Sequence, residues 1–132
     1  MTEPTRSLFE QMGGEPALRL VIDEFVDRMF DDVMIGYFFA RVSREHIKRM
    51  EYEFAAQKLG ADVLYSGRSL EVAHRAHRIF DGQFLRRLTL LRETLERHGV
   101  PESVKEFWLR LTESERDTVV AAFCESPAVT RE

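Results

Sequence analysis

The feature that most constrains the fold is a run of apolar residues at helical spacing that follows a glycine pair. In the segment GGEPALRLVIDEFVDRMFDD, apolar side chains recur at positions 18, 21, 22, 25, 26 and 29. This spacing places them on one face of an α-helix. Pro16 suits the first turn of that helix, where a missing N–H costs nothing. The segment is therefore predicted to be one amphipathic helix over 16–31, with a face that must be buried.

Further helical segments follow, each bounded by residues that favour helix ends. Ser43 can cap a helix over 43–59, which Gly60 would end, and Ser69 can cap a short helix that contains two histidines. Helices are also predicted over 82–98, closed by the sequence HGVP, and from 101 to about 123. Because no segment shows the alternation of a strand, the chain is predicted to be all-α.

Length, charge and hydropathy limit the domain count and the partners. With 132 residues, 44% of them hydrophobic, the chain can bury one core, so we expect a single domain over 1–132 with a C-terminal tail from about 124 to 132. The 23 acidic and 19 basic side chains give no positive field for nucleic acid. No apolar run approaches the about 20 residues that cross a bilayer, and the start MTEPTRSLFE lacks the pattern of a secretion signal. We expect no membrane partner and a cytoplasmic location.

The stretch SLEVAHRAHRIF carries His74 and His77 and allows three interpretations. The histidines can be ordinary polar residues on a half-exposed helix. Glu71 and His74 have the Glu-x-x-His spacing of carboxylate-bridged metal sites, but the chain has no second such pair. A single histidine can also hold haem iron in an apolar pocket, with cations near the propionates. Candidates for that pocket are Phe25, Phe38, Phe39, Phe54, Phe80 and Phe84 for its walls and Arg68, Arg75 and Arg78 with Tyr65 for the propionates. These residues alone leave the three interpretations open.

One face of the predicted helix over 43–59 contains a carboxylate among apolar side chains. Ile47, Met50, Glu51 and Phe54 share this face. A carboxylate in such a place must be hydrated, paired or protonated, because burial disfavours its charge. Glu51 therefore either reaches the rim or an arginine, or has a functional role.

Three stretches of the sequence resemble the truncated haemoglobins, a family of small haem proteins. SLFEQMGGEPALRLVIDEF is similar to the start of the family, YFFARV to its aromatic corner, and KLGADVLYSGRSLEVAHRAHRI to the run that leads to its proximal histidine. The resemblance covers residues from about 7 to 111, and its glycines resemble group I, also called N. It implies a two-over-two sandwich of antiparallel helix pairs enclosing haem b. The pairs would be 16–31 with 43–59, and 82–98 with 101 to about 123.

The resemblance also implies which residues meet the cofactor. It assigns the iron to His74 and gives His77 no iron role, so that His77 would face a propionate or solvent. Phe39 would pack against the porphyrin face, and Ile47, Met50 and Glu51 would form the distal wall. The remaining candidate cofactor-binding residues are Val26, Phe54, Tyr65, Arg68, Ile79 and Phe84.

Two departures from the family pattern bear on ligand binding. Members that bind oxygen tightly commonly have a tyrosine where this chain has Val26, and a glutamine where it has Glu51. Loss of a donor from a dry pocket costs about 1–3 kcal/mol, so we expect fast oxygen release or fast autoxidation. Ligand sensing or nitric oxide and redox chemistry is then favoured over oxygen storage. A protonated Glu51 could instead donate to the ligand. Met50 could be a sixth iron ligand, although we favour simple packing above the ring.

Two functions of different class follow. The first is a haem protein that binds a diatomic gas (O2, NO or CO), as a monomer or weak homodimer, with an electron-donating reductase as a further partner. Nitric oxide dioxygenase or peroxidase-like activity would fit it. The second is a globin fold without haem that serves as a helical interaction or regulatory module. In both cases Arg86, Arg87 and Arg92 are expected to form a solvated helix face.

Overall fold

The computed structural model describes residues 6–67 and 80–118, and each regular element in these two ranges is helical. Arg68, His74, His77 and Ile79 lie outside the described residues, as does the short helix predicted from Ser69. The elements are α1 (Leu8–Gln11), α2 (Gly14–Asp31), the 3-10 helix η1 (Gly36–Phe39), α3 (Arg44–Lys58), α5 (Asp81–Arg97) and α6 (Glu102–Ser114). The predicted all-α class is confirmed.

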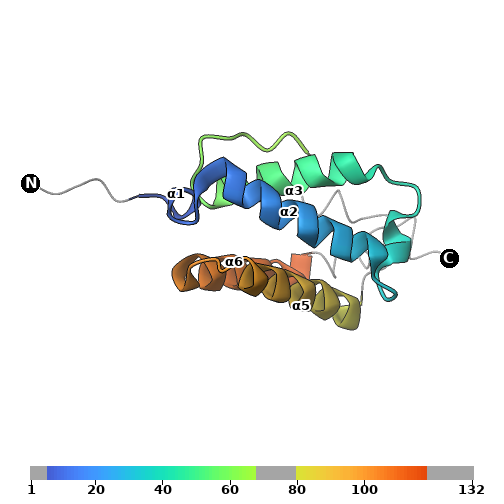
Figure 1. Ribbon diagram of the computed structural model, residues 1–132. Helices are drawn as coiled ribbons and strands as arrows, with labels where there is room; N and C mark the ends of the chain where they lie inside the picture. Colours follow the sequence, from blue (N-terminus) through green and yellow to red (C-terminus); the bar gives the residue numbers. More distant parts are fainter. Residues whose placement is uncertain (1–5, 68–79, 119–132) are drawn as a thin grey trace, which may run out of the picture.

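The four long helices form two layers, as Figure 1 shows. In that view α2 and α3 make the upper layer and α5 and α6 the lower one, with the two helices of each layer antiparallel. This is the predicted two-over-two arrangement. Helix α2 packs against α3 within its layer and against α5 in the other, whereas α3 makes few contacts with α5 or α6. The layers are thus joined tightly under α2 and loosely under α3.

Capping residues place the helix ends close to where the sequence predicts them. The Ser43 hydroxyl accepts the N–H of His46 at 3.2 Å, and Gly60 follows α3 with a φ of 100°, a conformation that favours glycine. The helices predicted over 16–31, 43–59 and 82–98 agree with α2, α3 and α5 to within two residues at each end. The short α1, which has no apolar period of its own, is not among the sequence predictions. Ser7 and Glu10 form its capping box.

The last predicted helix is interrupted near its end. Helix α6 stops at Ser114, Glu115 forms a turn, and residues 116–118 are helical again, while the rest of the predicted extension to about 123 lies outside the described residues. The Ser114 hydroxyl donates to the carbonyl of Leu111 at 2.6 Å, and the N–H of Glu115 bonds to the carbonyl of Thr112 at 3.0 Å. These bonds to carbonyls three residues back tighten the last turn and compete with the regular helical ladder.

The core lies between the layers and is centred on α2. Every apolar position of the predicted α2 stripe is buried: Leu18, Val21, Ile22, Phe25, Val26 and Met29. The other helices add Tyr52, Ala55, Ala56, Leu90, Leu91, Leu95, Val104 and Trp108 to the same cluster. Two further residues of α5, Phe84 and Leu88, are buried outside this cluster. They indicate a second apolar region, toward the N-terminal end of α5.

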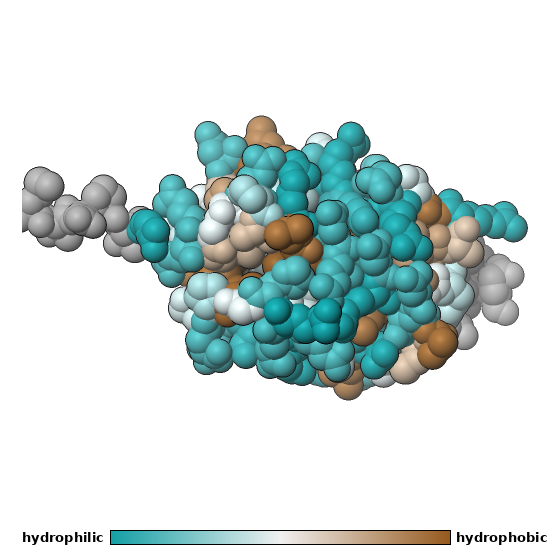
Figure 2. All heavy atoms as spheres, in the orientation of Figure 1, coloured by the Kyte–Doolittle hydropathy of each residue, from teal (hydrophilic) through white to brown (hydrophobic). Residues whose placement is uncertain are grey.

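The visible outer face of the molecule is mostly hydrophilic, with small separate apolar patches (Figure 2). None of the helices that the structure describes is both long enough and apolar enough to pass through a membrane. Charged side chains on the surface form ion pairs within and between helices, such as Arg19 with Glu15 and Arg28 with Glu93.

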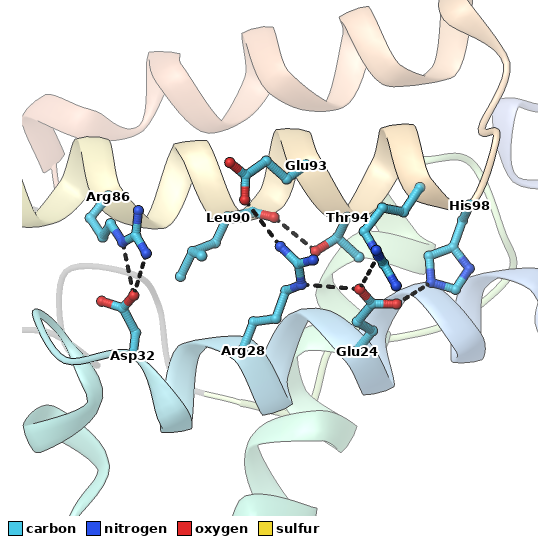
Figure 3. A network of polar contacts seen from close by, with 9 residues as sticks. Glu24, Arg28, Asp32, Arg86, Leu90, Glu93, Thr94 and His98 are labelled. Atoms are coloured by element: carbon cyan, nitrogen blue, oxygen red, sulfur yellow. Dashed lines mark hydrogen bonds and ion pairs between the residues drawn. The ribbon is translucent and has the colours of Figure 1, made fainter.

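Ion pairs join α2 to α5 along their shared edge (Figure 3). Glu24 of α2 accepts hydrogen bonds from Arg28 at 3.0 Å and Arg97 at 2.8 Å, and it lies 2.9 Å from the ring of His98. Burial opposes the charge of this carboxylate, but the bonds from His98 and Arg97 outweigh it and hold the pKa of Glu24 below its usual value. A polar network therefore fixes α2 and α5 relative to each other.

A second ion pair joins α2 and α5 at the C-terminal end of α2. Asp32, directly after α2, binds Arg86 at 2.7 Å and accepts the backbone N–H groups of Met34 and Ile35 at 3.0 and 3.2 Å (Figure 3). The bond from Arg86 is the largest cause that lowers the pKa of Asp32. Arg86 is itself 36% exposed, so it keeps part of the predicted solvated face, but it also binds a carboxylate that is only 4% exposed. Sequence spacing gives no sign of this pairing.

Candidate functional site

A pocket lies where the two layers are loosely joined, between α3 and the α5–α6 pair. Its volume is about 20 Å³, room for about one water molecule. The lining includes apolar and small groups, Phe54, Ala55, Leu59, Trp108, Leu111 and Thr112, and four charged ones, Glu51, Lys58, Arg87 and Glu115. Charged side chains thus lie among apolar ones along the seam, by which we mean the boundary between α3 and the α5–α6 pair.

An ion pair between Glu51 and Arg87 crosses the seam from α3 to α5. The two Nη atoms of Arg87 donate to the two carboxylate oxygens of Glu51 at 3.2 and 3.3 Å. The side chains are 25% and 30% exposed. Of the interpretations that the sequence allows for Glu51, the structure shows the pairing with an arginine.

The guanidinium of Arg87 also contacts α2. Its Nη1 donates to Sδ of Met29 at 3.1 Å, and its Cζ lies 4.9 Å from the centre of the Phe25 ring. A cation over an aromatic face is held by the charge distribution of the ring. Arg87 of α5 therefore contacts both α2 and α3 and is not part of a solvated face, contrary to expectation.

Glu115 brings a second carboxylate to the same pocket. Burial is the main cause that raises its pKa, and the charge of Glu51 adds to it, while Arg87 and Lys58 act in the opposite direction. Glu115 therefore binds a proton more readily than an exposed glutamate does. The pocket carries two acids and two bases, so its formal charges balance.

Both charged residues that the sequence reasoning missed stand inside apolar helical stripes. Arg87 shares a face of α5 with Phe84, Leu88 and Leu91, and Glu115 continues a stripe formed by Trp108, Leu111 and Thr112. The same signal drew attention to Glu51. A charge within an apolar stripe was therefore the available clue to both.

The apolar candidates for cofactor binding lie at different depths. Val26 is fully buried in the main core. Ile47 is half-buried and packs against that core from α3. Phe39, at the end of η1, stacks on Phe30 with ring centres 4.6 Å apart, and Phe84 is buried on α5.

The chain after α3 is packed tightly onto that helix. Tyr65 meets the ring of Phe54 edge-on at 5.3 Å between centres. The N–H and hydroxyl of Ser66 donate to the Glu53 carboxylate at 2.9 and 2.7 Å. A Cβ atom on Gly67 would collide with the Tyr65 hydroxyl and with Sδ of Met50. Gly67 therefore lets the Tyr65 hydroxyl and the Met50 thioether approach the backbone closely, and a larger residue there would make these side-chain ends shift.

The remaining candidates cannot be placed relative to this pocket. Arg68, His74, His77 and Ile79 lie outside the described ranges. Within 6–67 and 80–118, no group of three or more His, Cys, Asp or Glu side chains could hold a metal ion. The described residues supply a pocket wall from α3, α5 and α6, and Tyr65 packs against Phe54 of that wall.

Comparison with known proteins gives a consistent result. The family model described as bacterial-like globin matches residues 7–123. The group 1 truncated hemoglobin GlbN of Synechocystis is 30% identical over 102 residues, covering 74% of this chain and 82% of the relative. A group 1 truncated hemoglobin of Tetrahymena pyriformis is 25% identical over 104 residues, covering 79% and 85%.

Solved structures share the fold. The Fe(III) form of truncated hemoglobin from Tetrahymena pyriformis has a TM-score of 0.81 at 23% identity, covering 87% of this chain and 98% of that chain. The 2/2 hemoglobin of Synechococcus with covalently attached heme has a TM-score of 0.82 at 22% identity, with the same coverage. The likeness covers nearly the whole of both solved chains.

Proposed function

The chain belongs to the bacterial-like globin family, and from this premise we propose that it is a haem b protein whose iron is held by His74. When bound, haem would supply an iron centre for a diatomic gas such as O2, NO or CO and for electron exchange. The relatives named as truncated hemoglobins support this assignment. His74 lies outside the described residues, so its role rests on the family resemblance alone.

The apolar part of the described lining suits the face of a flat apolar group between the layers. Phe54, Leu59, Trp108 and Leu111 line one pocket, and Phe84 is buried outside the main core. Haem has the same requirement for apolar and aromatic neighbours. The fit is in the lining and in the loose joint between α3 and the α5–α6 pair rather than in volume, since the cavity is only about 20 Å³. Phe39, Ile47, Phe54 and Phe84 would hold the faces of the group.

The charged pair carries the finer part of the proposal, which is ligand sensing or nitric oxide and redox chemistry rather than oxygen storage. Glu51 and Arg87 form a half-buried ion pair in the pocket. Val26, one residue beyond the Phe25 ring under Arg87, is apolar and fully buried, so α2 offers no hydroxyl there. A redox role would require an electron-donating reductase as partner, with nitric oxide dioxygenase or peroxidase-like activity as the reaction.

Absorption spectroscopy of purified protein tests the cofactor. We expect added haemin to give an intense Soret band that is lost or strongly shifted in His74→Ala. Unchanged spectra in His74→Ala would contradict the ligand assignment. A colourless protein that takes up no haemin would support the second hypothesis, a haem-free interaction or regulatory module.

Stopped-flow measurement of oxygen release tests the argument against storage. We expect fast release from the native protein. Val26→Tyr should slow release by about ten- to hundredfold, because a new donor in a dry pocket contributes about 1–3 kcal/mol. Slow release from the native protein that does not change in Glu51→Gln would contradict the proposal.

A further inference from the structure

Resting on the proposed function, we propose that Arg87 is a specificity-determining residue that donates hydrogen bonds to small anions in the pocket, and that Glu51 positions it. The class of ligand is a small monovalent anion of one to three heavy atoms, such as fluoride, azide or nitrite. The charged guanidinium of Arg87 would then donate hydrogen bonds to the ligand in place of a neutral donor such as a hydroxyl.

The guanidinium is fixed from three sides. Glu51 of α3 binds both Nη atoms, Met29 of α2 accepts from Nη1, and the Phe25 ring lies under Cζ. Arginine stays charged at all relevant pH values, so the positive charge is present whatever the pocket contains. Its position is set before a ligand arrives.

The guanidinium keeps hydrogen-bonding capacity. Of its five N–H bonds, three serve the contacts with Glu51 and Met29 that the described part of the chain provides. Arg87 lines the pocket itself. The other donors are therefore at hand for an acceptor in the pocket, and an anionic acceptor gains more from them than a neutral one.

Glu51 has two opposed effects on such an anion. It holds the guanidinium in place, and it also repels a second negative charge and competes for the same donors. Two acids, Glu51 and Glu115, balance two bases, Lys58 and Arg87, around the pocket. Removing one acid leaves a net positive site, whereas removing Arg87 leaves a net negative one. The two substitutions should therefore change anion affinity in opposite directions.

The experiment measures anion affinity separately from haem uptake. Haemin-loaded ferric protein is titrated with azide, fluoride and nitrite by absorption, and the ferrous protein with carbon monoxide as a neutral ligand. Arg87→Met should weaken anion binding by about ten- to hundredfold, since hydrogen bonds to charged groups are worth about 1.5–3 kcal/mol. Glu51→Gln should strengthen it by about tenfold. Carbon monoxide affinity should change by less than about threefold in both variants.

Arg92→Met is the matched control, because Arg92 lies exposed on the same helix. It should leave every affinity unchanged. If Arg87→Met and Arg92→Met bind anions equally well, the inference is wrong while the haem assignment stands. If Arg87→Met does not fold, Glu51→Gln decides, and an unchanged or lower anion affinity there overturns the inference. Native protein that takes up no haemin overturns both the proposed function and this inference.

Discussion

Arg86 and Arg87 are neighbours on α5, and each binds a carboxylate on an earlier part of the chain, yet the two ion pairs differ in kind. Asp32 is 4% exposed and has three further constraints, the N–H groups of Met34 and Ile35 and its place at the end of α2. Glu51 is 25% exposed, and its bonds within the described residues come from Arg87 alone. In the Arg86–Asp32 pair the carboxylate is fully bonded, and the pair serves the structure. In the Arg87–Glu51 pair, N–H donors of the guanidinium remain available in the pocket.

The largest expected difference is in stability. Asp32→Ala should lower the free energy of unfolding by about 2–3 kcal/mol, because it removes a charge-assisted bond and two backbone caps from a buried position. Glu51→Ala should cost less than about 1 kcal/mol, as partly exposed ion pairs do. Chemical denaturation of both variants, with Arg92→Ala as control, measures this. Equal losses at Asp32 and Glu51 would remove the distinction between the two pairs.

Acid should remove the stabilisation that the Asp32 pair provides. The pKa of Asp32 is lower in the folded protein than its ordinary value, chiefly because of the bond from Arg86. Its stabilisation is therefore complete above the ordinary pKa of an aspartate and disappears as the pH falls through the lower, folded pKa. Thermal unfolding between about pH 6 and pH 2 should show a steeper loss for native protein than for Asp32→Asn. Parallel curves would contradict the role of this carboxylate.

The smallest expected effect has the opposite sign and belongs to the pocket. Burial raises the pKa of Glu115, so its ionised form opposes folding above that raised value, and the cost disappears as the pH falls below the ordinary pKa of a glutamate. Glu115→Gln should raise the melting temperature slightly at neutral pH and give no gain in acid. The exposed Glu113→Gln serves as the control, and a melting temperature that falls at neutral pH would contradict the effect.

Much of the fold could be predicted from the sequence, because local rules decide it. The α2 stripe has helical period and is buried throughout, and Ser43 and Gly60 bound α3 by capping chemistry. The break after Ser114 was harder to predict, since it depends on a side-chain bond from Ser114 that competes with the regular helical ladder.

The polar half of the site was harder to predict. Arg87 pairs with a residue 36 positions earlier, and Arg86 with one 54 positions earlier, so no local pattern shows which carboxylate each selects. Charged residues usually face solvent, and this general expectation gives no sign that either arginine binds a largely buried carboxylate. The clue was the apolar stripe around Arg87. The role of His74 stays a prediction, because that residue lies outside the described ranges.

The ion pair between Arg86 and Asp32 restricts rotation of α5 about its own axis next to Arg87. The Cα atom of Arg87 is therefore held in place, and its guanidinium moves only through the side-chain torsions. If the proposed anion binds beside Arg87, it meets a preorganised charge, and we then expect selection among ligands to depend on their size and charge more than on induced fit.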